Sequence, residues 1–147
     1  MDSAYKKLAI MLPINAVLMF LLTYSMIDTF DHFYPNLNRA YMALIMVAPM
    51  GLVMLFFMRG MYPHPRINAG LIVGYVLVFI IAFWLARTQT FVGDEVFLRS
   101  MIPHHSSAIV MCEHATLSDP EIVTLCEEIV QAQEEEIAQM KAILERY

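Results

Sequence analysis

Three long blocks of this sequence contain no Asp, Glu, Lys or Arg, and they limit what the chain can fold into. The blocks cover residues 8–27, 40–58 and 69–86. An α-helix rises about 1.5 Å per residue, so about 20 apolar residues cross the roughly 30 Å hydrocarbon core of a bilayer. The sequence therefore predicts three transmembrane helices in its first 90 residues.

The composition agrees with a lipid-embedded part. Of the 147 residues, 59% are hydrophobic, which exceeds the share in an ordinary soluble domain. Lys6 and Lys7 precede the first block, as in a secretory signal, but the apolar run is longer than a signal core and no small-residue cleavage site precedes Asp28. We interpret the first block as a retained span.

Basic residues in the short loops predict the orientation, because cytoplasmic loops carry the excess of Lys and Arg. The first loop carries Asp28, Asp31 and His32 against one basic residue. The predicted cytoplasmic side holds four: Lys6, Lys7, Arg59 and Arg66. We therefore expect a bacterial inner membrane protein whose N-terminus is cytoplasmic and whose residues after Arg87 are periplasmic.

The charge of the chain is divided between its two parts. Residues 94–147 contain eleven acidic and three basic residues, a net charge of −8, whereas the preceding residues carry +3. An acidic tail argues against nucleic acid and favours cations or basic partners. Solvated helix faces explain the same pattern.

The blocks themselves contain no ionisable side chain, which argues against a proton-coupled transporter. A row of methionines recurs every four residues in the second block. Adaptable helix packing explains this row, and a copper-transporting channel is the alternative. Its members are Met42, Met46, Met50, Met54 and Met58.

The tail predicts two helices. The first runs from Asp94, a candidate N-cap, to about Ala115, and Pro103 bends or restarts it. Residues 118–121 read Ser-Asp-Pro-Glu, a helix-start signal, and the second helix runs to about Leu144. The predicted fold is all-α, with a three-span membrane domain (1–90) and an extramembrane antiparallel helical hairpin (91–147).

Candidate metal ligands gather on one face of the first tail helix. At about 100° per residue they fall within an arc of about 120°, while His114 lies off it. The set is Met101, His104, His105, Met111 and Cys112. The mainly apolar face of the second helix adds Cys126, Gln133 and Met140.

Imidazole, thioether and thiolate together prefer soft or borderline ions. Among such ions Cu(I) matches this ligand set best, with Ag(I) as its mimic, and Cu(II) is compatible with the imidazoles. Ca²⁺ and Mg²⁺ prefer oxygen ligands. Helix packing is the alternative for the histidines and methionines. For Cys112 and Cys126 a disulfide, metal ligation and inert packing all stay open.

The tail also carries a specific motif, M-I-P-H-H-S-S-A-I-V-M from Met101 and Q-E-E-E-I-A-Q-M up to Met140. With these residues the chain resembles the domain of unknown function 305 family. The resemblance implies a ferritin-like helical bundle outside the cytoplasm, and copper or silver binding through Met and His. The R-A-Y-M-A-L run at residues 39–44 resembles the integral-membrane branch.

Carried over to this sequence, the resemblance supports Gln133 as an orienting partner for five candidate ligands. These are Met101, His104, His105, Met111 and Met140. Cys112 and Cys126 depart from the family, in which small residues are common at these positions. The chain has one hairpin, half of a four-helix bundle, so we expect a homodimer or higher homo-oligomer.

The predicted function is a membrane-anchored, periplasmic copper-binding protein for copper homeostasis or resistance, without enzymatic activity and with a copper-handling partner protein. A structural interaction module with packed histidines is the first alternative. A ferritin-like di-iron oxidase is disfavoured, because that class uses Glu-x-x-His and no glutamate here precedes a histidine by three.

Overall fold

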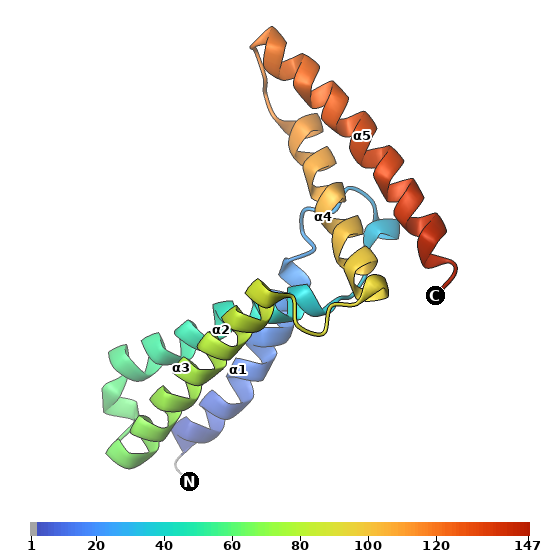
Figure 1. The fold of residues 1–147 in the computed structure, drawn as a ribbon. Helices are drawn as coiled ribbons and strands as arrows, with labels where there is room; N and C mark the ends of the chain where they lie inside the picture. The colour runs from blue at the N-terminus through green and yellow to red at the C-terminus, as the bar shows by residue number, and fades with distance from the viewer. Residues whose placement is uncertain (1–2) are drawn as a thin grey trace. The chain divides into compact units, whose positions relative to one another are not determined.

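The computed structural model describes residues 3–147, and within them the chain is entirely helical, as predicted (Figure 1). The α-helices and the short 3-10 helices follow one another as α1 (Ser3–Leu22), η1 (Phe30–His32), α2 (Leu37–Phe57), η2 (Arg59–Met61), α3 (Pro65–Thr88), α4 (Asp94–His114) and α5 (Pro120–Leu144).

The chain forms two compact units. The span unit comprises residues 3–23 and 38–90, and the tail unit comprises residues 24–37 and 91–147. The loop between the first two predicted spans thus folds with the C-terminal tail. In a chain with three crossings these two segments emerge on the same side of the membrane, so this partition agrees with the predicted number of spans.

The span unit contains three helices that are long and apolar enough to cross a membrane: α1, α2 and α3. α1 ends at Leu22, although the apolar block continues to residue 27. The reason is Tyr24, which is only 5% exposed in the tail unit and donates its hydroxyl hydrogen to the carbonyl oxygen of Tyr34 at 2.8 Å. The tertiary contacts of Tyr24, and not the length of the apolar block, therefore determine where α1 ends.

Aromatic and aliphatic side chains make the core of the span unit. Gly51 of α2 lies against the ring of Tyr75 in α3, where an added Cβ would be 2.8 Å from the nearest ring carbon. Most side chains of α3 are exposed within the chain, as expected of a helix that faces lipid. The buried members of this core are Tyr5, Leu8, Leu12, Val47, Leu55 and Tyr62.

The tail unit is built on α4 and α5, which pack against each other; α5 returns beside α4 (Figure 1). Their buried contacts recur at three- and four-residue intervals, as on the apolar stripe of a helix that packs on one face. The core consists of Leu98, Ile102, Ile109, Ile137 and Met140.

The helix starts of the tail are partly as predicted. Asp119 caps α5, because its Oδ1 accepts hydrogen bonds from the backbone N–H groups of Glu121 and Ile122. Asp94 is not the N-cap of α4. Gly93 holds that position, and Asp94 lies in the first turn, where its negative charge complements the helix dipole.

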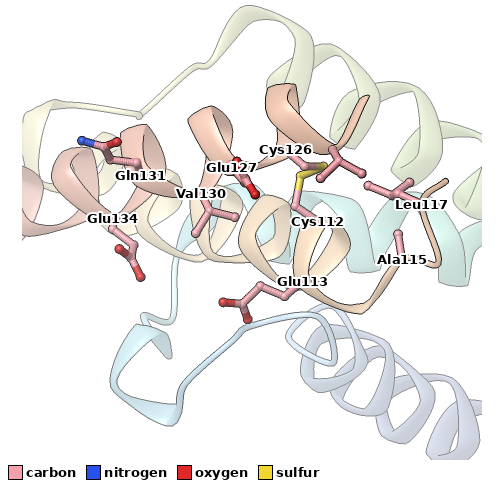
Figure 2. Close-up of a pocket in the computed structure, with 10 residues that line it drawn as sticks. Cys112, Glu113, Ala115, Leu117, Cys126, Glu127, Val130, Gln131 and Glu134 are labelled. Carbon is pink, nitrogen blue, oxygen red and sulfur yellow. A yellow bond between two sulfur atoms is a disulfide. The ribbon is translucent and has the colours of Figure 1, made fainter. Parts of the chain in front are cut away.

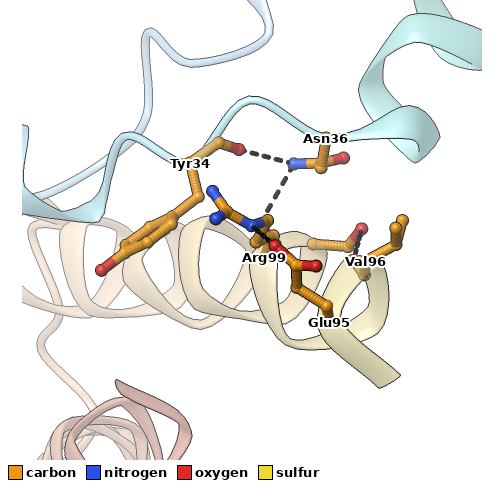
Figure 3. Close-up of polar contacts among 6 residues, drawn as sticks. Tyr34, Asn36, Glu95, Val96 and Arg99 are labelled. Atoms are coloured by element: carbon orange, nitrogen blue, oxygen red, sulfur yellow. Dashed lines mark hydrogen bonds and ion pairs between the residues drawn. The ribbon is translucent and has the colours of Figure 1, made fainter. Parts of the chain in front are cut away.

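Pro103 does not restart α4, which runs through it. Proline has no N–H, so the carbonyl of Arg99, four residues earlier, lacks its usual helical donor. The Nδ2 group of Asn36 donates to this carbonyl at 3.2 Å and to that of Tyr34 at 2.9 Å (Figure 3). The proline thus leaves an acceptor on α4 to which the first loop is bound.

Candidate metal site

His105 is the most informative of the predicted ligands. It lies on α4, is half-buried, and places its Nδ1 atom 2.9 Å from Oε2 of Glu136 on α5. The two atoms are at ion-pair distance but are not aligned as a hydrogen bond. Burial lowers the pKa of His105 below 6.5, although the carboxylate of Glu136 opposes the shift. The ring is therefore neutral near pH 7, as metal coordination requires.

The position of Glu136 suits a metal-binding histidine. Such a histidine commonly directs one ring nitrogen to a carboxylate and uses the other for the metal. With Nδ1 next to Glu136, Nε2 of His105 is the nitrogen left for coordination. Gln133, the predicted orienting partner, lies one turn before Glu136 on α5.

Two methionines belong to the core that adjoins His105. Met140 is buried in this core, and Met101, one turn before His105 on α4, packs against it. The structure thus brings thioether sulfur from both helices to the contact between α4 and α5. A soft ion held here could combine imidazole nitrogen with thioether sulfur.

The remaining predicted ligands of α4 are exposed. The ring of His104 is 5.9 Å from that of His105, centroid to centroid, and its side chain faces solvent. Met111 is 63% exposed and lies seven residues from His104, a rise of about 10 Å. Of the five predicted ligands, Met101 and Met140 therefore belong to the core between α4 and α5, His105 lies beside Glu136, and His104 and Met111 are exposed.

Cys112 and Cys126 are joined in a disulfide that links the end of α4 to the first third of α5. Of the three alternatives left open by the sequence, the structure contains the disulfide. Neither sulfur is then the thiolate that binds a metal ion. In this state the cysteines contribute to the connection of the two helices and not to coordination.

Carboxylates, histidines and cysteines alone do not form a metal centre in this structure. Within residues 3–147, no three side chains of His, Cys, Asp or Glu converge as a ligand set. The candidate site described above depends on methionine sulfur, which is the ligand that distinguishes a Cu(I) or Ag(I) site from a site for harder ions.

Sequence reasoning missed a second group, in which the first loop meets α4. Ser106 is fully buried; its Oγ accepts from the backbone N–H of Asp28 at 2.7 Å and lies 2.9 Å from Nδ1 of His32. Lys141 on α5 pairs with Asp31. Two features of the sequence could have indicated this contact: a polar serine inside the motif and the polar residues of the short first loop.

A cavity of about 310 Å³ adjoins these loop contacts, and it is lined by residues of the first loop, α4 and α5. Burial, and then the positive charge of Lys141, lower the pKa of His32, whereas Asp28 and Asp31 oppose the shift. The ion pair with Lys141 in turn lowers the pKa of Asp31. The lining is mixed in charge: Asp28, His32, Ile109, Glu134, Ile137, Ala138 and Lys141.

Comparison with known proteins identifies the family. Residues 84–144, which include α4 and α5, match the domain of unknown function DUF305. The chain is also 37% identical over 112 residues to an uncharacterized protein, L153, of Acanthamoeba polyphaga mimivirus, with 75% of this chain and 72% of the relative covered. No solved structure matches. The chain belongs to the DUF305 family.

Proposed function

We propose that this chain is a membrane-anchored metal-binding protein whose tail unit captures Cu(I), with Ag(I) as its mimic, in copper homeostasis or resistance. The observation that carries the proposal is His105: its Nδ1 lies beside Glu136 while Met101 and Met140 occupy the adjoining core. The protein would hold the ion and pass it to a copper-handling partner, without making or breaking covalent bonds.

The ligand set follows from helix geometry. Met101 precedes His104 and His105 by three and four residues, so the three side chains project from neighbouring positions of α4. Met140 supplies a fourth ligand from α5. Met111 is 63% exposed and outside the core that holds Met140, so it would serve as an entry ligand or in a contact with another chain.

The tail unit would lie in the periplasm, with the N-terminus of the chain in the cytoplasm. Two features support this orientation: the basic residues that flank the spans, and the disulfide, which persists in oxidising compartments. A cysteine introduced at Phe30, which is 84% exposed, should react with a membrane-impermeant reagent on intact cells. A cysteine at His64 should not, and the reverse labelling would contradict the orientation.

We further propose that α4 and α5 are an antiparallel hairpin, half of a ferritin-like four-helix bundle that a second copy completes. Large apolar side chains remain exposed in the tail unit, among them Phe97, Ile122 and Leu125. Cross-linking in mild detergent should trap a dimer or a higher closed assembly. A chain that stays monomeric at all concentrations in detergent and in lipid would contradict this arrangement.

The competing function is an interaction module that binds another protein. The same exposed apolar side chains favour it, because such patches mark contact surfaces. In that case His105 and Glu136 would be a packed ion pair between two helices, and metal ions would have no saturable site on the tail unit.

Equilibrium titration separates the two functions. The full chain in detergent, kept oxidised so that the disulfide is intact, is titrated with Cu(I) against a coloured Cu(I) chelator. We expect saturable binding of about one ion per chain, with loss of affinity in the Met101→Leu/Met140→Leu variant. The control is Met46→Leu in α2. Failure of the wild-type chain to compete for Cu(I) would leave the interaction module as the function.

A further inference from the structure

The disulfide opens onto a cavity of its own. This cavity has a volume of about 470 Å³ and lies where the end of α4 meets α5. Figure 2 shows the Cys112–Cys126 bond beside Leu117, with Glu127 and Val130 of α5 close to it. Apolar side chains, among them Leu117 and Val130, make part of the wall, and Glu113, Glu127 and Glu134 add carboxylates.

We propose that Cys112 and Cys126 form a second soft-metal site, distinct from that of His105, which is closed by oxidation and opened by reduction. In the disulfide, neither sulfur is a thiolate. A dithiol reductant supplies two electrons and two protons; the S–S bond breaks, two thiols form, and the reductant becomes a disulfide. One Cu(I) ion then displaces the two thiol protons and binds both sulfurs, with no change in its oxidation state.

The positions of the two cysteines favour this chelation. Their Cα atoms are 5.3 Å apart on two helices that also pack through Ile109 and Val130, one turn from the cysteines, so the thiols stay adjacent after the bond is broken. Two thiolates form the ligand set that Cu(I) binds most strongly among protein side chains. The acidic side chains raise the local concentration of cations.

The second site is spatially separate from the first. Cys112 lies seven residues, a rise of about 10 Å, beyond His105 on α4. The second site therefore needs neither His104 nor His105, and it can be tested independently of the proposed function. Its chemical consequence is a chain whose copper capacity depends on the redox state of its compartment.

The experiment compares the full chain in detergent in three states, each titrated anaerobically with Cu(I) against a chelator. The first sample is oxidised with diamide, the second is reduced and then freed of reductant, and the third is reduced and then reoxidised. We expect the reduced chain to bind about one more Cu(I) ion than the oxidised chain, with ultraviolet thiolate-to-copper absorption. Reoxidation should return the stoichiometry to its starting value, a comparison that needs no variant.

Two variants make the assignment specific. The additional ion should be absent from Cys112→Ser/Cys126→Ser and present in His104→Ala/His105→Ala, with helix content checked by circular dichroism. Equal stoichiometry of the reduced and oxidised wild-type chains would overturn the proposal. So would an additional ion that survives loss of the cysteines or disappears with the histidines, because reduction would then act on another site.

Discussion

The span unit and the tail unit differ in the contacts that stabilise each of them internally. In the span unit, most side-chain hydrogen bonds between segments lie near the helix ends, such as Tyr5 to Asn68 at 2.8 Å and Tyr41 to the carbonyl of Thr90 at 2.9 Å; an exception is Asn15, which donates to the sulfur of Met50 at 3.3 Å. In the tail unit, polar contacts reach the middle of α4, where Ser106 is bound to the first loop.

This difference follows from the surroundings of each unit. Within a bilayer a helix satisfies its own backbone, and association of the spans depends on shape, as in the contact of Gly51 with Tyr75. The tail unit has a small apolar core, and it adds a disulfide and loop contacts to it. Substitutions in the two units should therefore have different effects, and the proposed metal ligands and the histidines with lowered pKa lie in the tail unit.

The largest expected effect concerns metal affinity. Replacing His104 and His105 by Ala should reduce Cu(I) affinity at least about tenfold, because both imidazole ligands are lost. Competition titration measures this change, and circular dichroism should show unaltered helix content. Met42→Leu/Met46→Leu, in the span unit, is the matched control. An equal loss of affinity in the control would move the site from the tail unit to the methionine row of α2.

The next effect concerns the bond between the first loop and α4. Ser106→Ala removes the acceptor of the Asp28 N–H, and leaving such a group without a partner costs about 1–3 kcal/mol. Hydrogen exchange of residues 24–37 should accelerate. Ser107→Ala, which removes a hydroxyl bonded within α4, should leave the loop unchanged. Equal exchange in the two variants would show that Ser106 does not hold the loop.

A smaller effect is expected from Pro103→Ala. The alanine N–H can bond to the carbonyl of Arg99, which now accepts from Asn36. Loss of the Asn36 hydrogen bond should cost the loop about 1 kcal/mol of stability, so its amides should exchange faster, while α4 stays helical. Pro49→Ala in α2 is the control from the span unit. Unchanged exchange of residues 24–37 in Pro103→Ala would mean that the Asn36 contact does not depend on the proline.

The smallest effect is a dependence of the tail unit on pH. The pKa values of His32 and His105 are both lowered, so the unfolded tail binds more protons than the folded tail at acidic pH. The free energy of unfolding of the tail unit should be highest above the ordinary histidine pKa of about 6.5 and should decrease as the pH falls below it. Burial is the main cause of both pKa shifts; Lys141 adds to that of His32 and His104 to that of His105, whereas Asp28, Asp31 and Glu136 oppose them.

Hydrogen exchange of α4 and α5 at about pH 7.5 and pH 5.5 measures this dependence. The His32→Gln/His105→Gln variant should show a weaker dependence than the wild-type chain. Tail exchange that slows at the lower pH, after correction for the intrinsic rate, would contradict the direction of the two pKa shifts.

The parts of the fold that could be predicted are those with a local signal. Uncharged blocks of span length predict α1, α2 and α3, and the Ser-Asp-Pro-Glu start predicts α5. The end of α1 could not be predicted, because Tyr24 looks apolar in its block and its hydrogen bond is to Tyr34 of the first loop. Nothing periodic in the sequence reports such a tertiary contact.

The candidate site shows the same limit. Helical spacing places Met101, His104 and His105 on one face, but it does not give the exposure of each side chain or the nearness of Glu136 to His105. Pro103 predicts the loss of one helical hydrogen bond. It does not predict that Asn36, 67 residues earlier, donates to the carbonyl that is left.

The most direct test of the account is the coordination shell of copper in the oxidised, Cu(I)-loaded chain, measured by X-ray absorption. Because the disulfide removes thiolate ligands, sulfur in that shell must come from methionine. We expect both sulfur and imidazole nitrogen in the shell, with nitrogen lost in His104→Ala/His105→Ala and sulfur lost in Met101→Leu/Met140→Leu. A shell without sulfur, or one that is identical in all three proteins, would contradict a copper site at His105.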